Sequence, residues 1–115
     1  MSEVSYEMVK THDVIGVNVT NLTDENLGKI EEIVLNKATG EVHYAVLSFG
    51  GIMGMGDKLF ALPWKSLKYD STKNKFTVTQ SKEHLTKAPG FDKSHWPNMA
   101  DNSWQTTISK FYDTY

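Results

Sequence analysis

The chain has 115 residues, a net charge of −2 and no cysteine. This length suits a single domain with one core, and the lack of cysteine excludes disulfides, thiolate nucleophiles and cysteine metal sites. All twelve basic residues are lysines. Because the reading of phosphates and guanines relies on the arginine fork, we expect no nucleic-acid partner. No apolar run approaches the roughly 20 residues of a membrane-spanning helix, and a signal peptide is not recognisable. We therefore expect a cytoplasmic protein without an integral membrane segment, and leave peripheral membrane association open.

The charge is divided unevenly along the chain. Residues 1–57 hold three lysines against nine acidic residues, whereas residues 58–115 hold nine lysines against five acidic residues. In a compact fold these halves either form two faces of opposite sign or interleave. The sequence leaves both outcomes open.

The first half of the chain reads as strands. Residues 1–11 form a polar lead-in, and valines that alternate with polar residues predict a strand at 14–20. Two further strands, 28–36 and 41–49, are rich in β-branched and aliphatic residues and are joined by a tight turn. We expect Gly40 to take a positive φ in that turn, which completes a hairpin.

Two details of this hairpin limit the fold. The hydrophobic alternation slips at Glu31-Glu32, which predicts a bulge that coils the strand and favours a barrel. The strand 41–49 is apolar on both faces, with Tyr44 and Val46 on one face and Ala45 on the other. Such a strand needs cover on both sides. We expect the barrel interior on one side and a helix, a tail or another subunit on the other.

The second half of the chain continues the pattern. A strand at 58–63 ends at Pro63, a 3₁₀ turn follows, and strands are expected at 67–70 and 75–79. Ser81 can cap a short helix at 82–87. Residues 101–113 place Trp104, Ile108 and Phe111 on one stripe, which is typical of an amphipathic helix. We expect this helix to cover a barrel face, on its own subunit or on a neighbour.

The order of four short segments resembles the PRC-barrel family. These segments are Leu27-Gly28-Lys29-Ile30, Thr39-Gly40-Glu41-Val42, Ser48-Phe49-Gly50-Gly51 and Leu62-Pro63-Trp64. The resemblance extends from about His12 to Trp96. It implies a bacterial source and a mainly β fold, a small barrel with a short helix and a C-terminal helical extension. The expected division is a lead-in at 1–11, a barrel domain at 12–90 and an extension at 91–115.

The sequence offers no motif for catalysis. The histidines do not stand at the spacing that places metal ligands on one face, and the glycine loop 50–57 lacks the lysine and hydroxyl of a phosphate-binding loop. Adjacency of Ser94 and His95 does not by itself place their side chains in hydrogen-bonding geometry. We therefore expect no enzyme, no catalytic residue, no metal and no cofactor.

The resemblance implies docking onto larger complexes, so we expect a non-catalytic interaction or assembly module that self-associates as a homodimer. The candidate interface combines the two-faced strand, the glycine-loop tip and the C-terminal extension. Its residues are Tyr44, Val46, Ile52, Met53, Met55, Trp96, Trp104, Ile108 and Phe111. Two other classes remain open: an accessory factor that resembles the ribosome-maturation or photosynthetic branches of the family, and a small-molecule-binding barrel or enzyme.

Overall fold

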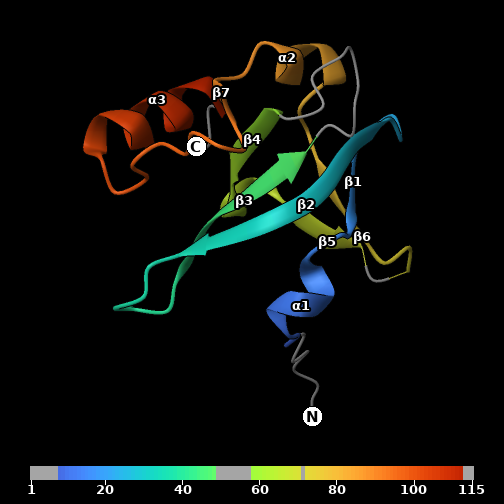
Figure 1. The fold of residues 1–115 in the computed structure, drawn as a ribbon. Coiled ribbons are helices and arrows are strands. Elements are labelled where there is room, and N and C mark those ends of the chain that lie inside the picture. The colour runs from blue at the N-terminus through green and yellow to red at the C-terminus, as the bar shows by residue number, and fades with distance from the viewer. Residues whose placement is uncertain (1–7, 49–57, 71, 113–115) are drawn as a thin grey trace.

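The computed structural model describes residues 8–48, 58–70 and 72–112. In the described residues seven strands form one sheet, with α1 and α3 at well-separated places on it (Figure 1). The strands are β1 (Asn18–Asn21), β2 (Asn26–Leu35), β3 (Val42–Ser48), β4 (Lys58–Pro63), β5 (Lys68–Asp70), β6 (Lys75–Val78) and β7 (Gly90–Asp92). The helices are α1 (Thr11–Val14), the 3₁₀ turn η2 (Trp64–Ser66), α2 (Lys82–Thr86) and α3 (Asn102–Tyr112).

The sheet is coiled and runs in the order β5-β6-β1-β2-β3-β4-β7. Its only parallel pair among the described residues joins β1 to β6, and the remaining neighbours are antiparallel. The expected mainly β barrel with a short helix and a C-terminal helix is confirmed. In the described part of the chain no ladder joins β5 to β7, so the barrel has two strand edges.

The β2–β3 hairpin has the predicted bulge and turn. The register steps from Ile30 opposite Leu47 to Glu32 opposite Val46 and leaves Glu31 as the extra residue. Gly40 has φ +81° in the connecting turn, where a side chain would be strained. The bulge and the turn are therefore both confirmed.

The first strand begins later than expected, so the prediction of a strand over residues 14–17 is wrong. Residues 11–14 form the single turn α1, in which the amide of Ile15 donates to the carbonyl of Thr11 at 3.0 Å. Gly16 then takes φ +91°, which interrupts the extended backbone. Val14 is 6% exposed and joins the core from α1, so its apolar character reflects burial and not a strand.

Strands β3 and β4 are buried on both faces, as the two-sided pattern predicts. Tyr44 and Val46 share one face with Ala61, while Ala45 and Leu47 share the other with their neighbours on β4. The indole ring of Trp104 on α3 meets the ring of Tyr44 edge to face at 5.0 Å between centroids. The face of β3 that carries Tyr44 is therefore covered by a helix of the same chain, α3.

The C-terminal part contains both predicted helices and one strand that was not expected. The hydroxyl of Ser81 accepts from the amide of His84 at 3.0 Å and caps α2 as predicted. Strand β7 pairs Phe91 with Leu59 of β4. It spans the expected boundary at residue 90, so the extension begins inside the sheet.

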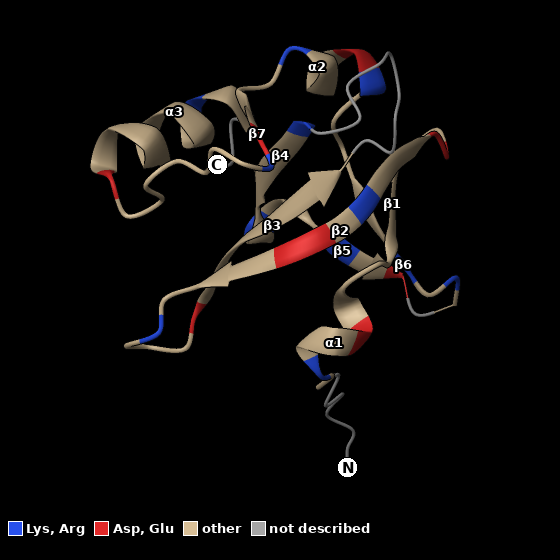
Figure 2. Ribbon diagram, in the orientation of Figure 1, with Lys and Arg blue, Asp and Glu red and all other residues tan. Residues whose placement is uncertain are grey.

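The acidic and basic halves of the sequence interleave, and both signs are spread over the described elements (Figure 2). Lys75 lies 2.6 Å from Asp24, and Lys93 lies 3.4 Å from Glu31, so each pair joins an acid of the first half to a lysine of the second. The hydrogen bond and the charge of Lys75 lower the pKa of Asp24. The acidic first half and the basic second half therefore form ion pairs with each other within the chain.

Candidate interaction surfaces

The structure brings four of the predicted interface residues together where α3 packs on β3 and β4. Tyr44, Val46 and Ile108 are 7%, 0% and 1% exposed and belong to the same core cluster. Trp104 is half-buried and packs against that cluster. These side chains already contact one another within one chain, so the outer face of β3 and β4 is covered.

The remaining predicted interface residues lie elsewhere. Phe111 is half-buried near the end of α3. Trp96 is 42% exposed, and its ring lies 5.0 Å from the ring of Phe91. Ile52, Met53 and Met55 lie outside the described residues, as does the glycine-loop tip.

The end of α3 is held against α2 by both rings and hydrogen bonds. The imidazole of His84 stacks on the ring of Phe111 at 4.2 Å between centroids, and its Nε2 lies 3.3 Å from the carbonyl oxygen of Phe111. The amide of Gln80 donates to the carbonyl of Tyr112 at 3.4 Å. The Tyr112 ring is buried, its hydroxyl has no partner among the described residues, and burial raises the pKa of Tyr112.

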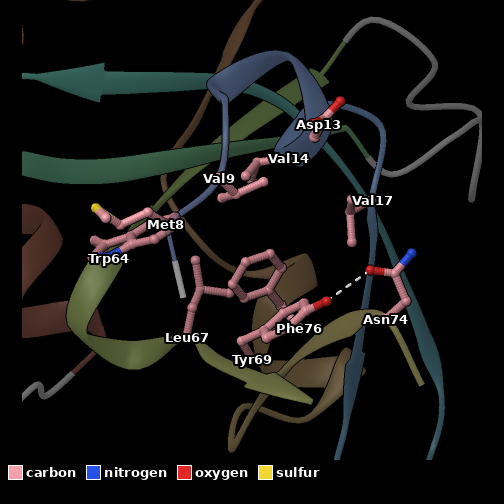
Figure 3. Close-up of a pocket in the computed structure, with 10 residues that line it drawn as sticks. All are labelled: Met8, Val9, Asp13, Val14, Val17, Trp64, Leu67, Tyr69, Asn74 and Phe76. Carbon is pink, nitrogen blue, oxygen red and sulfur yellow. Dashed lines mark hydrogen bonds between the residues drawn. The ribbon is translucent and has the colours of Figure 1, made fainter. Parts of the chain in front are cut away.

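A second surface is lined in part by α1, which lies away from α3 in the fold (Figure 1). It is a cavity of about 800 Å³, within the range of pockets that hold ligands. Figure 3 shows it between α1 and the segment that carries η2, β5 and β6. Its lining residues are Met8, Val9, Asp13, Val14, Val17, Trp64, Leu67, Tyr69, Asn74 and Phe76.

Aromatic rings form one wall of this cavity. The ring of Phe76 lies 5.7 Å from that of Trp64 and 5.2 Å from that of Tyr69. The hydroxyl of Tyr69 donates to the amide oxygen of Asn74 at 2.8 Å (Figure 3). This bond fixes the Tyr69 ring at the rim even though the side chain remains partly open to solvent.

The opposite wall is aliphatic and unusually exposed. Met8 is 83% exposed and Val9 is 59% exposed, while Tyr69 across the cavity is 44% exposed. Asp13 is the one carboxylate among the described residues that line the cavity. The cavity therefore presents apolar and aromatic surface to solvent with a single carboxylate at its edge.

The sequence analysis missed this cavity for a structural reason. Its walls come from three separate segments, near residues 8–17, 64–69 and 74–76. Met8 and Val9 were placed in a polar lead-in, and Tyr69 in an unremarkable short strand. The available signal was the pair of adjacent apolar residues just before α1, which no predicted strand or helix explained.

The described residues offer no catalytic constellation. They contain no group of three or more His, Asp or Glu side chains that could hold a metal ion. The hydroxyl of Ser94 lies 3.0 Å from Nδ1 of His95, but both residues are exposed and no described carboxylate pairs with that imidazole. A nucleophile of the serine type needs a third group to orient its base, and that group is not found in this part of the structure.

Comparison with known proteins identifies the family. The model of the PRC-barrel domain matches residues 7–85, which is more than half of the chain. The chain therefore belongs to the PRC-barrel domain family. No curated protein matches it.

Among solved structures, the chain is similar to a putative 16S ribosomal RNA processing protein, RimM, from Pseudomonas aeruginosa. The identity is 16% and the TM-score is 0.44, and the match covers 70% of this chain and 50% of that one. The chain thus spans half the length of that protein. A similarity of this strength carries no argument about function.

Within the described residues, no helix has both the length and the apolar character needed to cross a membrane.

Proposed function

We propose that this PRC-barrel protein is a non-catalytic interaction module that binds a segment of a partner protein in the cavity beneath α1. The observation that carries this proposal is the concentration of exposed apolar side chains around that cavity, with Met8, Val9 and Tyr69 at 83%, 59% and 44% exposure. Contiguous apolar surface with a polar edge is typical of protein interaction sites. Aromatic pockets of this kind hold the anchor residues of a partner.

The experiment places a photo-crosslinking amino acid, benzoylphenylalanine, at Tyr69 and, as a matched control, at Trp96. The two aromatic side chains are similarly exposed, at 44% and 42%, but only Tyr69 lines the cavity. We expect a discrete crosslinked protein from position 69 in native cells and none from position 96. The purified partner should then bind at least about tenfold more weakly to Tyr69→Ala than to Trp96→Ala, as expected when an aromatic residue of a binding site is truncated. Equal affinities for both variants would refute the assignment of the cavity.

Self-association is a second part of the proposal, and it takes place by exchange of α3 between two copies. The predicted interface residues Tyr44 and Val46 of β3 and Ile108 of α3 are buried within one chain. They can join two subunits only if α3 of one copy covers β3 and β4 of the other. Residues 93–101, which join β7 to α3, contain no helix or strand that would resist this exchange. Light scattering at micromolar concentration should give twice the chain mass of 13.0 kDa. A mass equal to one chain would refute the proposed self-association.

The ribosome-maturation and photosynthetic alternatives stay predictions, as does the small-molecule-binding barrel. No described contact favours any of them over the protein-interaction proposal.

A further inference from the structure

The Tyr69 ring stands on a short strand at the edge of the sheet. β5 has three residues, of which Tyr69 is the central one, and its partner strand among the described residues is β6. The side chain is 44% exposed. An aromatic side chain this open to solvent has more than one staggered χ1 rotamer within its reach. A further contact must therefore select the rotamer that lines the cavity.

A hydrogen bond at the tip of the ring makes that selection. The hydroxyl of Tyr69 donates to the side-chain amide oxygen of Asn74 at 2.8 Å, across the turn that joins β5 to β6. Figure 3 shows this bond between two side chains of the cavity lining. Because the hydroxyl is the part of the side chain farthest from the backbone, it moves farthest when χ1 changes. A bond at that atom opposes the other rotamers.

The backbone holds Asn74 in the place from which it reaches Tyr69. Asn74 has φ +51°, in the left-handed region that asparagine tolerates better than most residues with a side chain. Lys75 follows with its side chain 14% exposed, and its Nζ lies 2.6 Å from the carboxylate of Asp24 in the turn after β1. The turn that carries Asn74 is therefore tied to a neighbouring part of the fold.

We infer that Asn74 is a positioning residue of the cavity, because it holds the Tyr69 ring in the orientation that a partner segment contacts. This inference rests on the function proposed above and deepens it. A side chain that becomes ordered on binding lowers the affinity by the entropy it loses. A ring that Asn74 already holds avoids that loss. Asn74 thus acts on affinity through Tyr69 and needs no contact of its own with the partner.

Substitutions in the β5–β6 turn separate this role from general support of the turn. Asn74→Gly removes the acceptor and tolerates the positive φ, whereas Asn74→Asp keeps both an acceptor oxygen and a tolerance of that backbone. Thr72→Ala is the matched control, since it removes another hydrogen bond of the same turn, from the Thr72 hydroxyl to the carboxylate of Asp70 at 2.6 Å.

The first measurement is NMR of the free protein, which needs no partner. Three-bond couplings across χ1 of Tyr69 should show one dominant rotamer in the wild type, in Asn74→Asp and in Thr72→Ala. They should show averaging over several rotamers in Asn74→Gly. One dominant rotamer in Asn74→Gly would overturn the inference and leave the proposed function standing.

The second measurement is the affinity for N-phenyl-1-naphthylamine, an uncharged apolar dye that fluoresces when it leaves water. Asn74→Gly should bind it roughly two- to tenfold more weakly than the wild type, while Asn74→Asp restores the affinity and Thr72→Ala leaves it unchanged. Tyr69→Phe keeps the ring but lacks the donor, so it should weaken binding by the same factor, and the double variant with Asn74→Gly should weaken it no further.

Two results of the dye titration contradict these expectations in different ways. An equal loss of affinity in Thr72→Ala and Asn74→Gly would overturn the positioning role of Asn74 alone, because any damage to the turn would then have the same effect. An affinity that is the same in the wild type and in Tyr69→Ala would overturn both the inference and the proposed function, because the Tyr69 ring would then form no part of a binding surface.

Discussion

Replacing Ile108 by alanine tests whether α3 is an integral part of the folded domain. The Ile108 side chain is 1% exposed and belongs to the core cluster that covers β3 and β4. If α3 folds cooperatively with the barrel, Ile108→Ala destabilises the whole protein. If α3 is instead only loosely attached to the barrel, the substitution destabilises the helix alone.

The expected size follows from the burial of this side chain. Alanine lacks three of the carbon atoms of isoleucine, and each buried methylene contributes about 0.8 kcal/mol. The space left beneath α3 adds a cavity term, since the core around it relaxes only in part. The free energy of unfolding should therefore fall by about 3 kcal/mol. For a domain of this size the corresponding fall in Tm is on the order of 10 °C.

The assay is urea unfolding followed by both far-ultraviolet circular dichroism and tryptophan fluorescence. Ser109→Ala is the matched control, because it changes the next residue of α3 on its exposed side. The two probes should give coincident transitions at a lower urea midpoint for Ile108→Ala and an almost unchanged midpoint for the control. A stability within about 0.5 kcal/mol of that control, a difference typical of surface substitutions, would refute the account of α3 as a core element.

Three further substitutions test other contacts. Gly90→Ala should lower the free energy of unfolding by about 1–3 kcal/mol through overpacking, because the added Cβ would lie 2.8 Å from the buried ring of Phe60 and 3.0 Å from the carbonyl oxygen of Leu59. The urea midpoints of the two proteins measure this loss. Asn21→Ala should cost a similar amount, since the buried amide oxygen accepts from the amide of Thr23 at 3.1 Å and from the amide of Glu25 at 2.9 Å. Tyr112→Phe should be neutral or stabilising at neutral pH, because the hydroxyl it removes is buried without a partner among the described residues. Burial raises the Tyr112 pKa, so the folded protein keeps this proton while the unfolded chain loses it near pH 10; wild-type stability should therefore fall as the pH rises above about 10, and Tyr112→Phe should fall less.

Local signals in the sequence were sufficient for the hairpin and for both later helices. A glycine in a four-residue connection and an alternation slip at a pair of glutamates depend only on neighbouring residues, and the structure contains the turn and the bulge they predict. The same holds for the cap at Ser81, where the side chain acts on an amide three residues away. Elements of this kind can be read from sequence because their energetics are local.

The errors concern elements whose identity depends on distant contacts. Strand β7 has three residues and exists as a strand through its pairing with β4. The parallel pairing of β1 with β6 joins segments far apart in the chain, which no short pattern specifies. Val14 is apolar but lies out of phase with Val17 and Val19; Gly16 takes φ +91°, and Val14 reaches the core from the helical turn α1. Tertiary packing overrides local preference at each of these places.

The position of α3 decides which surface remains for a partner. The sequence analysis placed the interface on the outer wall of β3, because an apolar strand needs cover on both faces. That need is met within the chain, where Tyr44 and Ile108 are 7% and 1% exposed. Of the exposed large apolar side chains, Met8 at 83%, Val9 at 59% and Tyr69 at 44% line the one cavity beneath α1, whereas Leu22 at 75% and Leu35 at 45% lie outside it. Because a buried face cannot bind a partner without first losing its cover, the open cavity is the surface at which binding has the lower cost.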